Sequence, residues 1–428
     1  MKQNSTKYIK NLPPKGTADW MPEEFRIRNY IFDTFRKVCL SFGYEEYLTP
    51  TFEKSEIYKA KSGEDVGGKE LIIFKDKVNR EFALRPEMTP SVIRMITRIY
   101  NNQPKPIRYF SIANFFRNEK PQRGRNREFW QLNYDIFGSK SIYADAEIVR
   151  IALEIMFAFL PKEKINQKDY KPFVIYINDR RVLTHFLRED IGVSKENMEK
   201  IFRILDKKNK IKNEEFENRL KEENLNNKQI QKIYSFMQGN IPLDSDVSKE
   251  LNQLLEILKQ EGYEKWVEFK PSLVRGFDYY NGIVYEVYDN DPQNNRALFG
   301  GGRYDGLGKL FGDYNIPAVG VAPGDETLKL FLENWDLLKN LSRGEKTSYY
   351  IPIIEEKTHK YLSEISKKLR EENNIVIESL EKQSLTKSLE FANKKNIDKV
   401  VIMGSNELEK KQYIEKDMKT GKQNVIIL

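Results

Sequence analysis

The chain has 428 residues with 39% hydrophobic and 12% aromatic content, which is enough to fold and too long for one ordinary core, so we expect two or three domains. The net charge of +8 and the pI near 9.0 favour a polyanionic partner, although a solvated lysine-rich surface gives the same charge. The single cysteine, Cys39, excludes disulfides within the chain and a cysteine-built zinc site, and two histidines, His185 and His359, leave little material for a histidine metal site or a Ser-His-Asp triad.

The N-terminal stretch lacks the apolar core of a signal peptide, and no run approaches the ~18 apolar residues of a membrane helix, so we expect a soluble, cytoplasmic protein without membrane contact. A helix is predicted over residues 23–42, because Pro22 suits a first helical turn and the glutamates after it suit the positive end of a helix. Its buried face is expected at Phe25, Tyr30, Ile31, Phe35 and Val38. Cys39 lies in the same pattern and is expected in the core. Residues 44–51 are then predicted to form a strand that ends at Pro50.

Two strand-like runs, residues 70–75 and 81–84, precede a predicted helix over residues 91–100. Glu87 and Thr89 lie between them, in a loop that follows a strand. Such a loop can hold a carboxylate and a hydroxyl towards a ligand amine, and the same residues are compatible with an N-terminal cap of the next helix.

Residues 107–116 and 127–135 are aromatic-rich predicted strands, joined by the basic loop 117–126 into an open antiparallel hairpin. Its arginines would place several guanidinium groups over one surface, which suits phosphate binding: Arg117, Arg123, Arg125 and Arg127. Gln131 and Asp135 are four residues apart on the returning strand, so their side chains are expected on one face of the sheet.

A helix over residues 144–159 and a strand over 173–177 follow. From residue 181 to 262 the charge density rises, glycine and proline are few, and apolar residues recur at helical spacing, which indicates a helical insertion. Its basic stretch 207–212 can meet nucleic acid, although a solvated helix face is at least as common for such a pattern.

Residues 273–282 (LVRGFDYYNG) bring an arginine, an aspartate and two tyrosines together between glycines, and residues 297–307 (ALFGGGRYDGL) add three glycines and another arginine. A fixed cation, hydroxyl groups and a glycine-rich backbone favour a site for a small polar ligand with negative charge. The residues alone are equally compatible with a structural role, in which two strands are joined by turns and the tyrosines are half-buried. A strand over 319–323, a helix over 325–334 and a linker over 340–346 follow. From residue 349, strands alternate with helices, which predicts a small α/β domain with a mixed sheet.

In this order the motifs resemble those of histidyl-tRNA synthetase, a class II aminoacyl-tRNA synthetase, over nearly the whole chain. The helix and strand that end at Pro50 resemble class II motif 1, residues 116–131 (FRNEKPQRGRNREFWQ) resemble motif 2, and residues 273–282 and 297–307 resemble the two histidine-specific boxes. The last 80 residues or so resemble an anticodon-binding domain.

The resemblance implies an α+β fold: a catalytic core with an antiparallel sheet flanked by helices (residues 1–180 and 263–338), a helical insertion (181–262) and a C-terminal α/β anticodon-binding domain (347–428). It implies a homodimer that ligates L-histidine to tRNA(His) through a histidyl-adenylate, with ATP as substrate and Mg²⁺ accompanying it. No protein side chain is assigned as a metal ligand.

The resemblance also implies residue roles. Arg117 and Arg275 would be the catalytic residues, which contact the α-phosphate from opposite sides. The histidine pocket would consist of Glu87, Thr89, Gln131, Asp135, Tyr279 and Tyr280. ATP would be held by Arg117, Glu119, Arg125, Phe129 and Arg275. Asp135 stands where many relatives have glutamate, so its reach is shorter.

One position departs from the family. Class II motif 3 ordinarily carries an arginine that holds the γ-phosphate, and here Thr327 stands in its place. We expect another cation to substitute: Arg125, Arg303, Lys329 or magnesium.

Two other interpretations stay open at this point. The departure at Thr327 favours a non-catalytic regulatory or accessory relative that binds histidine or tRNA, although the regulatory relative of histidine biosynthesis normally lacks the C-terminal domain. A synthetase for another amino acid is opposed by the two histidine boxes.

Overall fold

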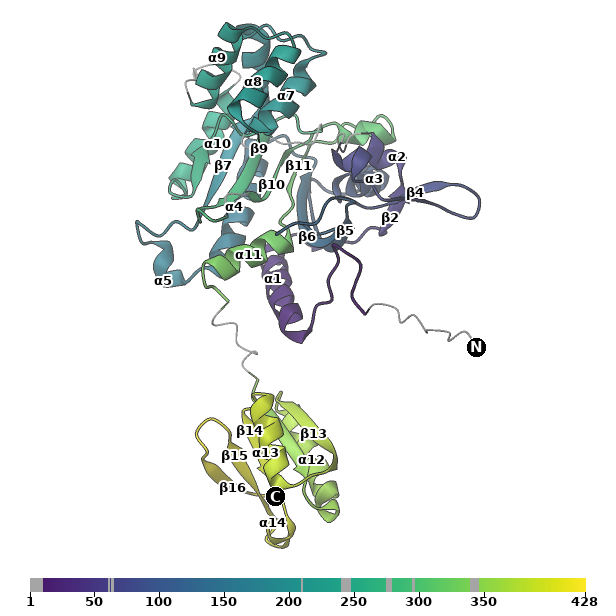
Figure 1. The fold of residues 1–428 in the computed structure, drawn as a ribbon, viewed down its shortest axis with the longest axis vertical. Helices are drawn as coiled ribbons and strands as arrows, with labels where there is room; N and C mark the ends of the chain where they lie inside the picture. Colours follow the sequence, from purple (N-terminus) through teal and green to yellow (C-terminus); the bar gives the residue numbers. More distant parts are fainter. Residues whose placement is uncertain are drawn as a thin grey trace, which may run out of the picture. The chain divides into compact units, whose positions relative to one another are not determined.

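The computed structural model describes residues 11–60, 62, 65–208, 211–239, 248–274, 279–294, 297–338 and 346–428 (Figure 1). Contacts divide the chain into two compact units, Met1–Lys339 and Asn340–Leu428. Within the described residues, no helix combines the length and apolar character needed to cross a membrane.

The first unit is built on one large sheet. Its strands are β1 (Glu45–Glu46), β5 (Ile107–Phe116), β6 (Glu128–Phe137), β7 (Phe173–Asp179), β8 (Val267–Phe269), β9 (Ile283–Asp289), β10 (Ala297–Arg303) and β11 (Ala318–Val321). Across the described residues they follow the order β1-β5-β6-β11-β10-β9-β7-β8. The inner strands pair antiparallel, and only the edge strands β1 and β8 pair parallel with their neighbours. The antiparallel core that the resemblance implied is therefore confirmed.

The two faces of this sheet have different roles. Helices α1 (Pro22–Ser41), α4 (Ile142–Phe159) and α11 (Asp325–Asn334) pack on one face and form a large core with the even-numbered residues of β6, Leu132, Tyr134 and Ile136. The opposite face meets helix α3 (Thr89–Ile99) in a smaller core that includes Tyr279 and Tyr280. Because successive side chains of a strand point to opposite faces, the odd-numbered residues of β6 turn to this second face.

Motif 1 differs from the prediction in two places. Phe25 is 45% exposed, because Arg28 takes the inward position at that turn of α1 and pairs with Asp325 at 2.5 Å. The predicted strand 44–51 is reduced to β1, whose pairing with β5 ends after Glu46. Beyond it the carbonyl of Thr49 accepts a hydrogen bond from the Arg85 guanidinium at 2.8 Å. A side chain therefore takes the place of the backbone N–H that a neighbouring strand would provide.

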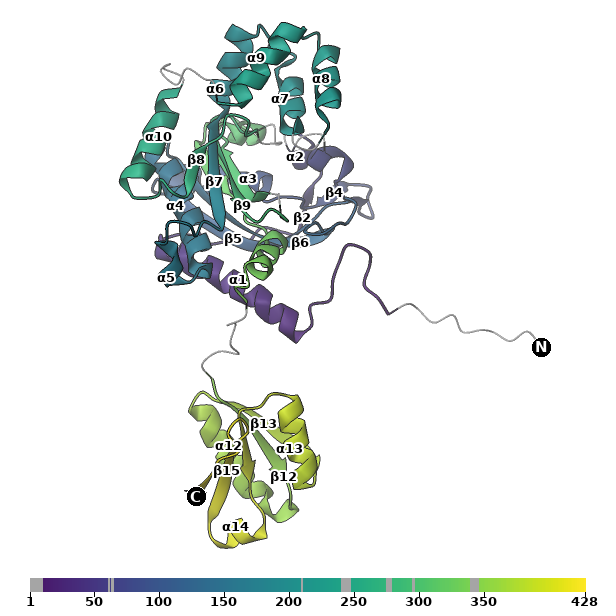
Figure 2. The ribbon, with the colours of Figure 1, turned by 60° about the vertical axis from the view of Figure 1, so that its left-hand side comes forward.

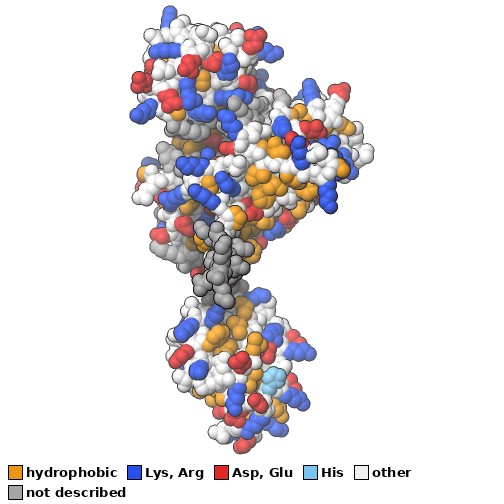
Figure 3. Space-filling model, turned by 45° about the vertical axis from the view of Figure 1, so that its right-hand side comes forward, with side chains coloured by type: hydrophobic (Ala, Val, Ile, Leu, Met, Phe, Trp, Pro, Cys, Tyr) orange, Lys and Arg blue, Asp and Glu red, His pale blue; other side chains and the backbone are white. Residues whose placement is uncertain are grey.

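A second, three-stranded sheet lies beside helix α2 (Glu56–Lys59) and has the order β2-β4-β3. Its strands are β2 (Phe52–Lys54), β3 (Ile73–Lys75) and β4 (Glu81–Leu84). Phe52 and Phe74 pack edge to face across this sheet and are 49% and 39% exposed. Figure 3 shows one face of the protein on which hydrophobic side chains gather between lysines and arginines.

Between β7 and β8 the chain forms a group of helices at one end of the first unit (Figures 1 and 2). They are α6 (Arg180–His185), α7 (Met198–Asp206), α8 (Asn213–Glu222), α9 (Asn227–Met237) and α10 (Lys249–Gln260). Ile201, Phe216 and Ile233 are buried among them and continue the large core of the sheet. A short helix, α5 (Lys162–Ile165), precedes β7.

The second unit is a five-stranded mixed sheet with the order β13-β12-β14-β15-β16. Its strands are β12 (Ser348–Ile353), β13 (Ile375–Lys382), β14 (Lys399–Ile402), β15 (Gln412–Asp417) and β16 (Gln423–Ile427). Helices α12 (His359–Glu371) and α13 (Leu385–Lys394) cover its two faces, as alternation along β12 requires: Tyr349 packs in the core with α12 and Tyr350 with α13. A short helix, α14 (Ser405–Glu409), lies between β14 and β15.

Candidate active site

A cavity of about 1190 Å³ opens on the second face of the large sheet. All of the candidate site residues that the structure describes line it: Glu87, Thr89, Arg117, Glu119, Arg125, Phe129, Gln131, Asp135, Tyr279 and Tyr280. They come from the loop before α3, the β5–β6 hairpin and the segment before β9, which are far apart in the sequence. Arg275 lies outside the described residues.

Strand β6 supplies the floor of the cavity. Phe129, Gln131, Asn133 and Asp135 are alternate residues of one strand and all line the cavity. The strand is held on both sides, by β5 over its whole length and by β11 from Tyr134 to Phe137. The four-residue spacing of Gln131 and Asp135 predicted that they share a face of the strand. Asn133, which lies between them on the same face, was not predicted as a site residue.

Asp135 is buried at the deep end of this row. Burial raises the pKa of its carboxyl to about 7, and a hydrogen bond from the Tyr304 hydroxyl at 2.6 Å acts in the opposite direction. Gly320 pairs with Asp135 across β11 and β6, and a Cβ on this glycine would lie 1.8 Å from Asp135 Oδ1. Only glycine leaves room for the carboxyl here. Tyr304 lines the cavity and was not among the candidate residues, although it belongs to the second glycine-rich motif.

Glu87 forms a second buried carboxyl, on another wall of the cavity. Its Oε2 accepts a hydrogen bond from the Tyr279 hydroxyl at 2.7 Å, and that hydroxyl lies 3.5 Å from Thr89 Oγ1. Burial raises the pKa of Glu87, while the nearby Ser62 hydroxyl, the Tyr279 hydroxyl and the charge of Arg117 lower it. Glu87 Oε1 is buried and has no hydrogen-bond partner among the described residues. An unpaired buried carboxylate oxygen can receive a ligand ammonium group.

The other end of the cavity carries guanidinium groups. Arg117 Nε donates to the Pro86 carbonyl at 3.1 Å, and its guanidinium lies over the Phe129 ring, 5.0 Å from the centroid. Arg125 is 54% exposed and lies 3.5 Å from the Glu119 carboxylate. These contacts leave Arg117 beside an aromatic face and Arg125 in water, an arrangement that suits a nucleotide phosphate.

Thr327 lies near the N-terminus of α11 and lines the cavity. Its hydroxyl donates to the Leu298 carbonyl of β10 at 2.6 Å. Two of the cations expected to substitute for the missing arginine point elsewhere, so that expectation is wrong for them. Arg303 is buried in an ion pair with Asp145, and Lys329 pairs with Glu24 at 3.0 Å. Arg125 remains at the cavity.

Asp325 opens α11 and was also missed. It is fully buried, accepts a hydrogen bond from the Trp130 backbone N–H at 3.0 Å, and pairs with Arg28 of α1. Burial raises its pKa to about 6, with Arg28 acting in the opposite direction. One carboxyl at the cavity wall therefore joins α1, β6 and α11.

The helical region between β7 and β8 contributes a further wall. Arg180, Phe202, Arg203 and Lys207 line the same cavity. Arg180 pairs with Glu199 at 3.2 Å, and its guanidinium lies 4.5 Å from the centroid of the Phe202 ring. No active-site residue was predicted in this region, where the sequence pattern offered only the basic stretch 207–212, and Lys207 of that stretch lines the cavity.

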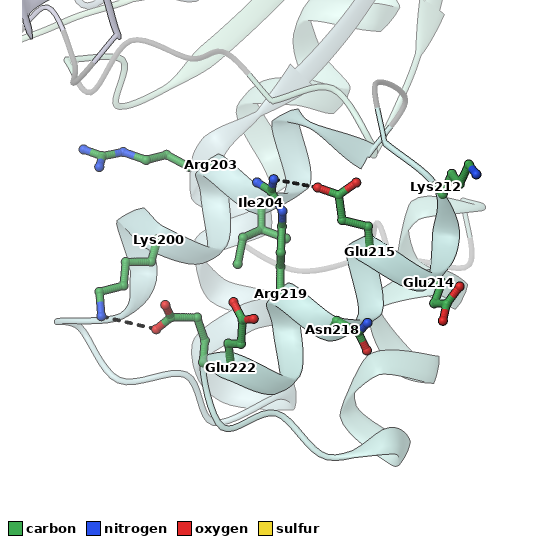
Figure 4. A pocket seen from close by; sticks show the side chains of 10 residues that line it. Lys200, Arg203, Ile204, Lys212, Glu214, Glu215, Asn218, Arg219 and Glu222 are labelled. Atoms are coloured by element: carbon green, nitrogen blue, oxygen red, sulfur yellow. Dashed lines mark hydrogen bonds and ion pairs between the residues drawn. The ribbon is translucent and has the colours of Figure 1, made fainter. Parts of the chain in front are cut away.

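A separate hollow of about 680 Å³ lies on α7 and α8 (Figure 4). Its charges alternate in sign and pair with one another, as in Lys200 with Glu223 at 3.3 Å and Arg219 with Glu215 at 2.7 Å. Exposed ion pairs of this kind are typical of a solvated charged surface, so we assign no site to this hollow.

Known proteins resemble this chain over most of its length. A family model described as histidyl-tRNA synthetase matches residues 16–328. The histidine–tRNA ligase of Leptospira biflexa is 38% identical over 418 residues, 96% of this chain and 93% of the relative. That of Thermococcus kodakarensis is 36% identical over 433 residues, 96% and 95% of the two chains. The crystal structure of histidyl-tRNA synthetase from Nostoc sp. PCC 7120 is similar over 98% of this chain and 97% of its own, with a TM-score of 0.80 and 25% identity.

Proposed function

Because the chain belongs to the histidyl-tRNA synthetase family, we infer that it ligates L-histidine to tRNA(His) at the expense of ATP. The observation that carries this function is the convergence of the ten candidate residues that the structure describes on one cavity. A carboxylate oxygen of histidine attacks the α-phosphorus of ATP, and pyrophosphate leaves. A hydroxyl of the terminal tRNA ribose then attacks the carbonyl carbon, and AMP leaves. Neither step needs a protein nucleophile, so catalysis depends on alignment and charge neutralisation.

The buried end of the cavity is proposed to bind the amino acid. The unpaired Glu87 Oε1, together with Thr89 and Tyr279, receives the α-ammonium group. Gln131 and Asp135 face the imidazole from β6, with Tyr280 beside them. Buried groups that need a partner discriminate strongly, because an analogue without nitrogen atoms leaves them unpaired.

The exposed end is proposed to bind ATP. Phe129 offers an aromatic face for adenine, and Glu119 offers an acceptor for its amino group. Arg117 approaches the α-phosphate, Arg275 faces it from the opposite side, and magnesium enters as the complex of the ATP phosphates. Such a complex needs few protein ligands. Within the described part of the chain, no cluster of three histidine, cysteine or acidic side chains could hold a metal by itself.

Arg125 is proposed to replace the missing motif 3 arginine. It lines the cavity, whereas Arg303 and Lys329 are paired outside it. An oxygen of the Glu119 carboxylate lies 3.5 Å from a guanidinium nitrogen of Arg125. Because this ion pair is long, a phosphate can attract the guanidinium without breaking a short one.

The two remaining partners are a second copy of the chain and tRNA. Exposed apolar side chains on α1 and on the three-stranded sheet, among them Phe25 and Phe52, support a homodimer. The C-terminal unit is proposed to bind the anticodon, and the net charge of +8 favours association with tRNA.

The deciding experiment is histidine-dependent ATP–pyrophosphate exchange by the pure protein, followed by charging of tRNA(His). Exchange with histidine and with no other amino acid is expected. Histidine binding without exchange would indicate the non-catalytic relative instead, and exchange with another amino acid would move the chain to a different synthetase.

A further inference from the structure

Asn133 is a cavity residue that neither the motifs nor the family roles assigned. It lies on β6 midway between Gln131 and Asp135, and its side chain lines the same cavity. Alternate residues of a strand are roughly 6.5–7 Å apart, so a ligand ring that reaches from Asp135 towards Gln131 passes over Asn133.

The amide of Asn133 is not satisfied by the protein. The residue is only 5% exposed, and its Nδ2 is buried without a hydrogen-bond partner among the described residues. Buried amide groups in folded proteins are almost always paired, so an unpaired one at a ligand cavity needs an explanation. A half-turn of the amide exchanges its donor and its acceptor, which lets it present either one to a ligand.

Two further buried polar groups lie on the same face of the sheet as Asn133. Ser111 stands directly opposite it on β5, and the Ser111 Oγ and the Tyr47 hydroxyl are both buried. Residues directly opposite in an antiparallel pair have side chains on one face, so Ser111 lies on the cavity side of the sheet. Burial is the main cause that raises the pKa of Tyr47, the charge of Asp135 raises it further, and a hydrogen bond with Ser111 lowers it, which places this hydroxyl beside both.

Resting on the proposed function, we propose that Asn133 is a specificity residue that hydrogen-bonds a ring nitrogen of the bound histidine. Ser111 and Tyr47 add two polar side chains on the same face of the sheet. Asp135 has a shorter side chain than glutamate, and its carboxyl is already engaged by Tyr304. The Asn133 amide, on the same floor of the cavity, supplies the reach that Asp135 lacks. Together the two side chains can offer a hydrogen-bond donor and an acceptor to the two nitrogens of the imidazole.

The test compares Asn133→Ala with the unchanged protein in histidine-dependent ATP–pyrophosphate exchange. We expect KM for histidine to rise by roughly 10- to 100-fold, since a buried hydrogen bond to substrate is lost, and KM for ATP to stay the same. Misactivation of thienylalanine, whose five-membered ring has no nitrogen, should rise relative to histidine.

Thermal melting separates this role from a structural one. Because the Asn133 amide is unpaired in the ligand-free protein, Asn133→Ala should leave the ligand-free Tm unchanged or raise it, and it should reduce only the rise caused by histidine. The matched control is Asn178, a buried asparagine of β7 whose Nδ2 donates to the Pro271 and Leu273 carbonyls, both at 2.9 Å. Asn178→Ala should lower the ligand-free Tm by about 2 °C or more.

A lower ligand-free Tm for Asn133→Ala with an unaltered KM for histidine would make Asn133 structural and overturn the proposal. The proposed function fails separately: in that case the unchanged protein itself shows no exchange with histidine. Normal exchange by both proteins with equal KM values overturns only the assignment of Asn133.

Discussion

At the proposed histidine end of the cavity, Glu87 and Asp135 are 4% and 5% exposed and accept hydrogen bonds from tyrosine hydroxyls. At the proposed phosphate end, Arg125 is 54% exposed and lies 3.5 Å from the Glu119 carboxylate. The first arrangement is rigid and leaves buried polar atoms for the ligand to satisfy. The second is solvated and can move towards a charge. Selectivity is therefore expected to come from the amino-acid end, and ATP attraction from exposed arginines, whose charge is screened by salt.

The difference has a physical origin. Imidazole differs from other side chains of similar size by the positions of two nitrogens, and only fixed, dry hydrogen-bonding groups can read such a difference. Triphosphate carries several charges, which a mobile guanidinium can neutralise without a fixed geometry.

The largest effect is expected where the two ends meet, at the α-phosphate. Arg275→Ala should lower the exchange rate by roughly 10³-fold, because a guanidinium that neutralises the transition state is lost. The ligand-free Tm should change little. Exchange assays and thermal melting of the same preparation measure the rate and the Tm. A large loss of Tm together with the loss of rate would show that Arg275 has a structural role.

Glu87→Gln tests the buried end alone. The variant keeps the shape and loses the charge that receives the ammonium group, so kcat/KM for histidine should fall by roughly 100-fold while KM for ATP is unchanged. The ligand-free Tm should be equal or higher, since an ionised buried carboxyl is removed. Equal increases in both KM values would contradict the division of the cavity into two ends.

Arg125→Ala tests the exposed end. KM for ATP should rise by roughly 10-fold, and KM for histidine should be unchanged, because the guanidinium is proposed to bind the ATP phosphates and not the amino acid. Steady-state exchange at varied ATP gives both constants. Arg123→Ala is the matched control: it removes the same charge from the same loop, but Arg123 is exposed and does not line the cavity. If both variants weaken ATP equally, net charge explains the effect and Arg125 has no particular role.

The smallest effect is a pH dependence at Asp135. Burial raises its pKa to about 7 in the folded protein from an ordinary value of 3.8, so its stabilising contribution is complete below about pH 4 and is lost as the pH rises through 7. Asp135→Asn has no such proton, so relative to it the unchanged protein should lose about 2–4 °C in Tm between pH 4.5 and pH 8. Parallel Tm curves for the two proteins would show that Asp135 is not protonated in this range.

Most of the local structure followed from the order of residues. Aromatic-rich runs on either side of a basic loop predicted the β5–β6 hairpin, and a proline with two acids predicted α1. Arg117, Glu87 and Gln131 were recognisable because they sit in short motifs whose backbone context is local. The error at Phe25 arose because helical periodicity cannot tell which apolar side chain meets the sheet when a buried arginine has a carboxylate partner almost 300 residues away.

By itself, then, the sequence determined the β5–β6 hairpin, the C-terminal α/β unit and the chemical types of the site residues, since those depend on spacing and short motifs. The antiparallel core as a whole followed from the resemblance to a known family. Tertiary structure alone decided that Arg303 and Lys329 are paired away from the cavity, that Tyr304 meets Asp135, and that Asn133 faces the cavity with an unpaired amide. Each of these depends on which distant strand or helix lies opposite. Pairing of that kind is set by the packing of whole elements, and no window of neighbouring residues contains it.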